Sequence, residues 1–381
     1  MQKLTKGKYD FLIFITVIIL VLFGCVMVYS ASYYSATIEE GDAAYYFKKQ
    51  ILGAVLGFAA MLFMANFNFQ RIDKVKIPLA IVTIGLLLMV FTPLGITLNG
   101  ARRWVNLGVT TMQPSELCKI TVVVLLSSYF AKNREKISTW TGGIIPAFAI
   151  SAAMCIPIIL QPNLSMVLCI MITTFIMLFA CGANKKHLMI LCLAGLAAVA
   201  VLIIIEPYRL KRLFVFLDPW SDTQGDSWQL IQSYYAIGSG GLFGKGLVSE
   251  GSFASLGYIP DDHTDMIFAI VCEAFGFVGG GSLILAYLLL IFRLVQHAIR
   301  VQDAFGSYII FGVTAMLLFH IVENICMVIG LLPVTGIPLP FVSYGGSSYL
   351  TNILGIGLVQ NVVMREKRNP VPNAPLRAVR I

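Results

Sequence analysis

Long apolar runs separated by short polar segments dominate the sequence. An apolar run of roughly 17 to 25 residues is long enough to cross a hydrocarbon core about 30 Å thick as an α-helix. The pattern predicts about ten such spans, with approximate bounds 11–31, 50–66, 77–96, 117–131, 144–160, 164–181, 187–205, 266–293, 306–330 and 347–364. We therefore expect an all-α polytopic membrane protein.

The basic residues between these runs predict the orientation of the chain. Lys and Arg gather in short loops on the cytoplasmic side of a membrane. With ten spans, both chain termini fall on that side, together with the basic segments near 71–76, 132–136, 185–186 and 293–300. The span at 11–31 is expected to be retained, because no Ala-x-Ala cleavage site precedes the acidic loop at 39–42.

Composition agrees with this picture. Hydrophobic residues make up 58% of the chain and charged residues 12%, and the mean hydropathy is +0.85, which is incompatible with a water-exposed surface. The net charge of +8 comes mostly from the cytoplasmic segments and suits anionic lipid rather than nucleic acid. The 8 cysteines lack metal-ligand spacing and are expected to be packing residues.

One membrane domain, residues 1–368, is expected to cover nearly the whole chain, followed by a short disordered tail at 369–381. Three segments on the outer side carry more polar chemistry than connecting loops need. The first contains Arg102, Arg103 and Trp104, with Glu116 and Lys119 further along.

Paired guanidinium groups beside an interfacial indole suit a phosphate or pyrophosphate headgroup, because guanidinium forks match phosphate oxygens. Two simpler interpretations remain for this segment. The arginines could snorkel to lipid headgroups, and Glu116 could be only a favourable charge in the first turn of a helix.

The second outer segment is the long loop 206–265, which is too apolar for a solvated connector. It carries Arg212, Gln232 and Ser233, and a glycine-rich stretch at 236–246. Glycines allow close backbone approach, but this stretch lacks the spacing of a nucleotide-binding loop.

The loop ends in the polar cluster 261–265, which includes His263, Thr264 and Asp265 and directly precedes an apolar run. Ionisable residues at such an edge are functional candidates. A carboxylate there is close to water and to low dielectric, so Asp265 could serve as a general base. The alternative is that Thr264 or Asp265 caps the following helix.

The third outer segment, 335–348, is dense in Pro and Gly and ends with the residues Ser343, Tyr344, Gly345, Gly346 and Ser347. Such a segment breaks a helix at membrane depth. Irregular backbone is tolerated there only where it lines a cavity or is buried in protein. We therefore expect a re-entrant turn that faces a substrate.

These motifs resemble those of the SEDS family (shape, elongation, division and sporulation), which includes FtsW, RodA and SpoVE. The likeness covers nearly the whole chain and leans towards the FtsW and SpoVE branch. It rests on Asn-Gly-Ala-Arg-Arg-Trp from 99, Gln-Pro-Ser-Glu from 113, Phe-Leu-Asp-Pro-Trp from 216, Ala-Ile-Gly-Ser-Gly-Gly from 236, His-Thr-Asp from 263 and Pro-Leu-Pro-Phe-Val-Ser-Tyr-Gly-Gly-Ser-Ser from 338.

The resemblance implies a peptidoglycan glycosyltransferase that polymerises lipid II on the outer face of the bacterial cytoplasmic membrane. Asp265 would take the proton from the 4-hydroxyl of the acceptor sugar in an inverting transfer that releases undecaprenyl pyrophosphate. Cationic and polar side chains of the three outer segments would bind the substrate, namely Arg102, Arg103, Trp104, Glu116, Lys119, Arg212, Gln232, Ser233, His263, Thr264, Ser343, Tyr344, Gly345, Gly346 and Ser347, with Lys211 a less direct candidate. No cofactor is assigned, although a divalent cation, Mg²⁺ or Mn²⁺, could bridge the pyrophosphate.

The expected partners are lipid II, a class B penicillin-binding protein transpeptidase, and other division or elongation membrane proteins. A lipid II flippase and a non-catalytic division scaffold are the alternatives. A flippase needs no base at the outer mouth, and a scaffold needs none of these polar groups. The chain departs from many relatives in having Asn163 where they have Asp, and in lacking a Gln-Lys pair before Tyr258.

Overall fold

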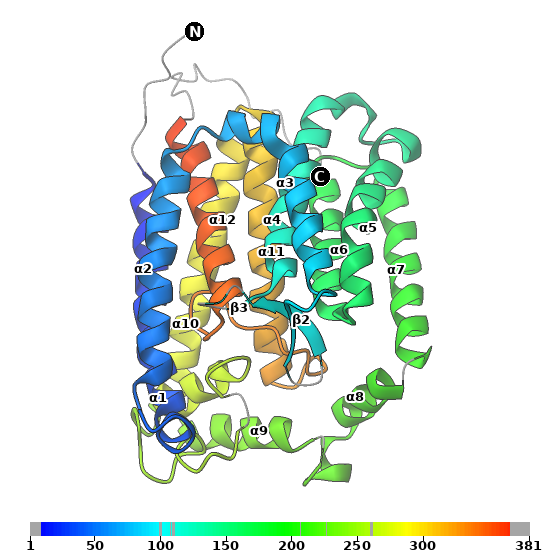
Figure 1. Cartoon of the computed structure of the whole chain (residues 1–381). Helices are drawn as coiled ribbons and strands as arrows, with labels where there is room; N and C mark the ends of the chain where they lie inside the picture. The colour runs from blue at the N-terminus through cyan, green and yellow to red at the C-terminus, as the bar shows by residue number, and fades with distance from the viewer. Residues whose placement is uncertain are drawn as a thin grey trace.

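The computed structural model describes residues 9–98, 101–106, 108, 111–205, 207–225, 227–259 and 262–365. The predicted tail at 369–381, Asp261, and the first two residues of the motif from 99 lie outside these ranges. The body of the molecule is a bundle of long helices (Figure 1), namely α1 (Phe11–Glu39), α2 (Tyr45–Asn66), α3 (Phe69–Met89), α4 (Pro114–Lys132), α5 (Ile145–Leu160), α6 (Leu164–Ala180), α7 (Lys185–Ile205), α10 (Ile267–Arg300), α11 (Ala304–Val328) and α12 (Gly346–Arg365). The predicted helical polytopic fold is confirmed.

Each predicted span coincides with one of these helices, but they are not equally apolar. Among the described residues, 7 helices are long and apolar enough to cross a membrane, namely α1, α2, α4, Trp140–Leu160, α7, α10 and α11. Trp140–Leu160 is α5 extended by the turn η2 (Trp140–Ile144), which follows η1 (Arg134–Lys136). The count of ten spans and the orientation stay predictions.

Short polar side chains set where several helices begin. Asp10 caps α1 by accepting a hydrogen bond of 2.9 Å from the amide of Ile13. Asp303 caps α11 in the same way through the amide of Gly306, at 2.7 Å. Pro114 lies in the first turn of α4, where its missing N–H would have no helical partner in any case. These residues fix the starts of helices whose apolar sequences alone would leave them undefined.

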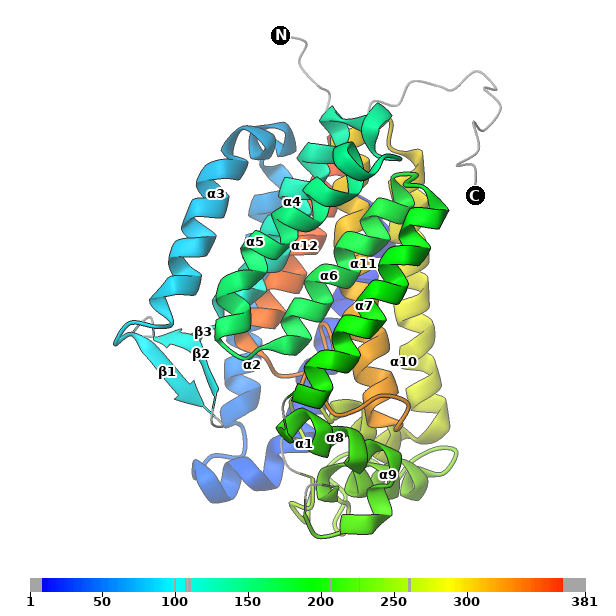
Figure 2. The ribbon, with the colours of Figure 1, turned by 90° about the vertical axis from the view of Figure 1, so that its right-hand side faces the viewer.

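Between α3 and α4 the chain forms a small antiparallel sheet that the hydropathy pattern did not predict. Its strands are β1 (Gly95–Leu98), β2 (Ala101–Asn106) and β3 (Thr111–Met112), in the order β1-β2-β3, with Ile96 opposite Trp104. The predicted span 77–96 is therefore wrong at its end, because α3 stops at Met89 and the chain becomes extended. Figure 2 shows the sheet at the edge of the bundle, below α3.

The predicted loop 206–265 is folded rather than open. It contains α8 (Pro207–Leu217), η3 (Pro219–Asp222) and α9 (Trp228–Gly240). α9 packs against α10 and α11. The main contacts of α7 are with α6 and α8, and it stands at the margin of the bundle in Figure 1.

α10 is interrupted near its start, at Gly276, whose φ of 65° and ψ of −162° are not helical. The segment 241–246 runs beside the interruption. Four backbone hydrogen bonds of 2.8 to 3.1 Å join it to 273–278 and replace helical bonds lost at the break. The predicted continuous span at 266–293 is thus corrected to two helical pieces that meet at this backbone junction.

The junction explains the glycine-rich stretch at 236–246. A Cβ on Gly240 would lie 2.0 Å from the carbonyl oxygen of Cys272, and one on Gly244 would lie 2.2 Å from that of Ala274. Only glycine allows the two backbones to approach so closely. These glycines therefore hold the long loop against α10.

The segment 335–345 enters the bundle between α11 and α12. A Cβ on Gly24, near the middle of α1, would lie 2.6 Å from the carbonyl oxygen of Phe341. The hydroxyl of Tyr287 in α10 donates to the carbonyl of Pro340 at 2.5 Å. The predicted re-entrant turn is present, and its irregular backbone is buried in protein as membrane depth requires.

The bundle has two distinct ends. We call the end that carries β1–β3, α8, α9 and the turn 335–345 the loop end. At the opposite end, the terminal end, the backbone of Asp10 exchanges two hydrogen bonds of 2.9 Å with the side chain of Gln360 in α12. The first and last described residues therefore lie close together.

Candidate active site

Asp265 lies at the loop end, immediately before α10, and is buried, with 8% of its surface exposed. The hydroxyl of Thr264 donates to its Oδ1 at 3.3 Å. The side-chain amide of Asn324, from α11, donates to its backbone carbonyl at 2.7 Å. The N-cap of α10 is Met266, and within the described residues no side chain caps this helix. The helix-cap interpretation of Thr264 and Asp265 is therefore wrong.

His263 sits in an aromatic cluster formed by three separate segments. Its ring centroid lies 4.3 Å from that of Tyr46, at the start of α2, and 5.5 Å from that of Tyr344. Its Nδ1 lies 3.1 Å from Oδ1 of Asp262. The amide of Tyr344 donates to the carbonyl of His263 at 2.9 Å, so the acidic loop and the re-entrant turn are joined directly.

Burial, followed by the nearby Tyr46, Tyr45 and Glu40, raises the pKa of Tyr344 to about 12. Its phenol is therefore neutral across the physiological range and keeps a proton to donate. A neutral hydroxyl in this position could hydrogen-bond a sugar or amide group of a bound substrate.

Glu116 and Lys119 form an ion pair of 2.7 Å in α4, and each side chain is at most 3% exposed. Lys119 Nζ also lies 2.9 Å from Nε2 of His320 in α11. Glu116 does stand in the first turn of its helix, but burial and pairing show that it is more than a helix-end charge. His320, which has no role predicted from the sequence, completes the cluster.

The stretch 334–337 is held by side chains from three helices. Arg212 of α8 donates to the carbonyl of Val334 at 2.7 Å, and Ser165 of α6 donates to that of Thr335 at 3.4 Å. Asn324 donates to the carbonyl of Ile337 at 2.7 Å. The position of this turn, and of Asp265 beside it, thus depends on contacts from α6, α8 and α11 together.

Two residues of α11 that hold this region, Glu323 and Asn324, were missed by the sequence interpretation. Asn324 donates to two backbone carbonyls, and the hydroxyl of Thr335 donates to the carboxylate of Glu323. The signal was available, because ionisable and amide side chains inside an apolar run are costly and mark functional positions.

The two arginines of the first outer segment donate hydrogen bonds to backbone carbonyls at the loop end. Arg102 is exposed and donates to the carbonyl of Thr92 at 2.5 Å. Arg103 donates to the carbonyls of Gln161 and Pro162 at 3.3 and 2.6 Å. Neither is simply a snorkelling lipid anchor. Trp104, the next residue of β2, is half-buried.

The polar residues of α9 and of the start of α12 also make structural contacts. Ser233 is buried and donates to the carbonyl of Val328 at 3.2 Å, which fixes α9 on the end of α11. Gln232 beside it is buried as well. Ser347 accepts the amide of Gln113 at 2.9 Å and so joins the start of α12 to that of α4.

Ser343 closes the re-entrant turn on itself. Its hydroxyl accepts the amide of Leu339 at 2.8 Å, and its carbonyl accepts the side chain of Gln50 at 3.2 Å. A Cβ added to Gly345 would lie 3.5 Å from the side chain of Pro338. Gly346 is exposed, and a Cβ added to it would meet no atom within 4 Å. The second glycine thus leaves room at the first turn of α12.

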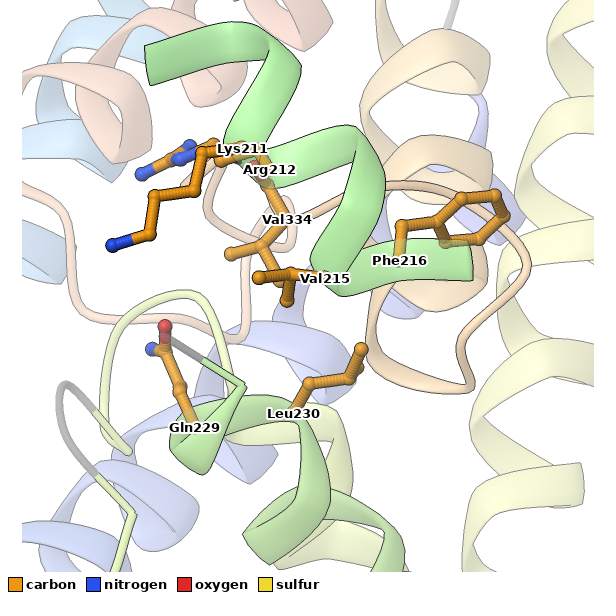
Figure 3. A pocket seen from close by; sticks show the side chains of 7 residues that line it. All are labelled: Lys211, Arg212, Val215, Phe216, Gln229, Leu230 and Val334. Carbon is orange, nitrogen blue, oxygen red and sulfur yellow. Dashed lines mark hydrogen bonds between the residues drawn. The ribbon is translucent and has the colours of Figure 1, made fainter. Parts of the chain in front are cut away.

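A cavity of about 100 Å³ opens between α8, α9 and the turn at 334, and Figure 3 shows its lining. The side chains of Lys211 and Arg212 extend on one side of it. The rest of the lining is apolar apart from one amide, and consists of Val215, Phe216, Gln229, Leu230 and Val334.

Asn163, a departure from the family pattern, caps α6. Its Oδ1 accepts the amide of Met166 at 3.3 Å. Asn and Asp serve about equally well in this position. The structure therefore gives the residue a role that needs no acid. Within the described residues, no group of three or more His, Cys, Asp or Glu side chains could hold a metal ion.

Comparisons with known proteins agree with this architecture. A family model described as "Cell cycle protein", of FtsW, RodA and SpoVE, matches residues 10–368. Stage V sporulation protein E of Bacillus subtilis (strain 168) is 36% identical over 358 residues, which is 94% of this chain and 97% of that protein. A probable peptidoglycan glycosyltransferase FtsW of Geobacter sp. (strain M18) is also 36% identical over 358 residues, which is 94% of this chain and 97% of that protein.

Solved structures are similar over nearly their full length. A chain from "Structural coordination of polymerization and crosslinking by a peptidoglycan synthase complex" has a TM-score of 0.74 at 27% identity, and the match covers 95% of this chain and 99% of that chain. The rod shape determining protein RodA of Thermus thermophilus has a TM-score of 0.67 at 27% identity, with 94% and 98% covered.

Proposed function

The chain belongs to the cell cycle protein family of FtsW, RodA and SpoVE, and we propose that it polymerises lipid II into glycan strands with Asp265 as the general base. It is a peptidoglycan glycosyltransferase, as are the relatives named FtsW that match more than nine tenths of its length. Lipid II as the substrate and the part of each residue are our proposal.

The observation that carries the mechanism is the placement of Asp265. It is buried at the loop end, it is not a helix cap, and α11 holds its backbone. In the reaction, the acceptor hydroxyl gives its proton to the Asp265 carboxylate while its oxygen attacks the anomeric carbon of the donor. The bond from that carbon to the pyrophosphate oxygen breaks with inversion, and no covalent intermediate forms.

The departing pyrophosphate needs cations near it. Lys211 and Arg212 line the cavity between α8 and α9, and the turn that Arg212 contacts also passes beside Asp265, which supports them as the cations that meet it. Arg102, Arg103, Arg212 and Lys119 already contact carbonyl or carboxylate oxygens, and direct phosphate binding by them stays a prediction. Binding of a divalent cation, Mg²⁺ or Mn²⁺, to the pyrophosphate also stays a prediction.

We place the protein in the bacterial cytoplasmic membrane, with the loop end outside, where lipid II is polymerised. A related chain belongs to a peptidoglycan synthase complex that couples polymerisation to crosslinking. By analogy we propose a class B penicillin-binding protein as partner, alongside other division or elongation membrane proteins.

The test is glycan synthesis from lipid II by the protein in liposomes with its partner, comparing the native chain with Asp265→Asn. Loss of the base should lower the rate by about 10²- to 10⁴-fold without preventing lipid II binding. Asp42→Asn is the matched control, since Asp42 is a half-exposed acid that pairs with Lys48 at the surface and accepts the amide of Ala44. Equal polymer from native chain and Asp265→Asn would end the general-base proposal.

The same liposomes test the second candidate, a lipid II flippase. A flippase would move lipid II across the bilayer without making polymer, and Asp265→Asn would not slow that movement. The buried carboxylate of Asp265 and the cation-lined cavity both lie at the loop end, which favours polymerisation over transport.

A further inference from the structure

Glu323 is a buried carboxyl that the proposed mechanism does not use. It lies on α11 between His320 and Asn324 and is only 6% exposed. Its Oε1 accepts the hydroxyl of Thr335. Its Oε2 is buried and has no hydrogen-bond partner within the described part of the chain. An anionic oxygen without a donor is costly in such surroundings, whereas a neutral carboxylic acid tolerates them.

The turn held by Glu323 separates it from Asp265. Thr335 contacts Glu323, and a Cβ on the adjacent Gly336 would lie 3.7 Å from Oδ2 of Asp265. Asn324, next to Glu323, donates to the backbone of Asp265. The two carboxyl groups interact electrostatically. They therefore flank one short turn, and the charge on one affects the other.

Among the described residues, the charged and titratable groups of α4, α6 and α11 around Glu323 leave no surplus positive charge, and the guanidinium of Arg212 in α8 donates to the carbonyl of Val334, one residue before Thr335. Lys119 and Glu116 on α4 neutralise one another at 2.7 Å, and His320 shares Lys119 at 2.9 Å. Cys169 of α6 lies within electrostatic range of Glu323, Lys119 and Glu116. Two ionised carboxylates on either side of one short turn in low dielectric repel each other, so the pair favours a state in which one of them is protonated.

We propose that Glu323 is a positioning residue of the glycosyl transfer that holds a proton while Asp265 is ionised. The inference rests on the proposed function, with Asp265 as base. The acceptor proton passes to Asp265, and Glu323 keeps its own proton throughout. The pair then presents one negative charge, rather than two, to the anionic pyrophosphate donor. It also keeps the Thr335–Gly336 turn in place beside the base.

This predicts a fall in the polymerisation rate at alkaline pH, where Glu323 ionises. Glu323→Gln is neutral at every pH and keeps the shape of the side chain. It should retain most of the native rate near neutrality and lose the alkaline fall. Glu323→Ala should lower kcat by about a hundredfold with little change in KM, because the turn beside the base is released. Glu250→Gln, an exposed glutamate of the same end, is the matched control.

The experiment measures initial rates on lipid II from acid to alkaline pH for the native chain and these variants. An identical alkaline fall in native chain and Glu323→Gln overturns the proposal. So does loss of activity in Glu323→Gln at every pH with rescue by Glu323→Asp, which would show that a negative charge is needed. A native chain that makes no polymer refutes the proposed function instead.

Infrared difference spectra provide a readout that needs no activity. During a pH titration, the native protein should show a protonated carboxyl band near neutrality that is absent from Glu323→Gln and present in Asp265→Asn. If that band is missing from the native protein, Glu323 holds no proton and the inference fails, whether or not the protein polymerises lipid II.

Discussion

Gly244 offers the sharpest test of how the loop end is held. Its φ is +82°, and an added Cβ would lie 2.2 Å from the carbonyl oxygen of Ala274. Two nearby glycines separate the causes. Gly246 has a φ of +93° but open space around it, and Gly238, inside α9, has open space and no positive φ. Gly244→Ala therefore introduces both a steric clash and backbone strain, and Gly246→Ala introduces backbone strain alone. Gly238→Ala introduces neither.

The magnitudes follow from these geometries. A positive φ costs a residue with a Cβ about 1–2 kcal/mol, so Gly246→Ala should weaken the local structure by about that much. In Gly244→Ala the clash is with backbone and no side-chain rotation relieves it. Segment 241–246 must then leave 273–278, which forfeits four hydrogen bonds at about 1 kcal/mol each, or about 4 kcal/mol. Gly238→Ala should be neutral or slightly stabilising.

Amide hydrogen exchange in detergent measures this directly, because the donors of the four bonds are the amides of Lys245, Gly246, Phe277 and Val278. With about 1.4 kcal/mol for each factor of ten, exchange at these amides should rise about tenfold in Gly246→Ala and about a thousandfold in Gly244→Ala. Native-like exchange should persist in Gly238→Ala. If Gly244→Ala exchanged no faster than Gly246→Ala, the close approach to α10 would not be what holds the loop.

Three further predictions concern other parts of the structure. Lys119→Met leaves the Glu116 carboxylate buried without its cation and should destabilise the protein by about 3–5 kcal/mol in thermal unfolding; the double variant with Glu116→Gln should recover much of this. Asn324→Ala removes two hydrogen bonds at about 1 kcal/mol each and should lower kcat by about tenfold or more, with lipid II binding unchanged, because the backbone of Asp265 is released. Burial raises the pKa of Asp10, but hydrogen bonds from its neighbours lower it more, so it lies below the usual 3.8; the stability it gives is present above pH 3.8 and is lost as pH falls through the lowered value. Asp10→Asn should therefore destabilise the protein at pH 7. In acid-unfolding measurements, the stability of the variant and of the native protein should converge at low pH.

Much of the fold follows from the sequence because lipid imposes a local rule. A span must be apolar over a fixed length, so hydropathy located a helix at each predicted position. The Pro- and Gly-rich composition of 335–348 likewise predicted a turn inside the bundle, since only protein or a cavity can surround such backbone. The candidate base was also found locally, because Asp265 stands where a polar cluster meets an apolar run.

The sequence by itself thus determined the helical membrane class, the family resemblance and the segments in which the site lies. Only the tertiary structure decided what those residues contact: that Met266 rather than Asp265 is the N-cap of α10, that Arg103 donates to the carbonyls of Gln161 and Pro162, and that Glu323 faces the turn beside the base. The physical reason is that hydropathy and helix propensity act over neighbouring residues. The hydrogen bonds and charge pairs of the site join segments far apart in the chain, and close packing of the whole bundle selects them.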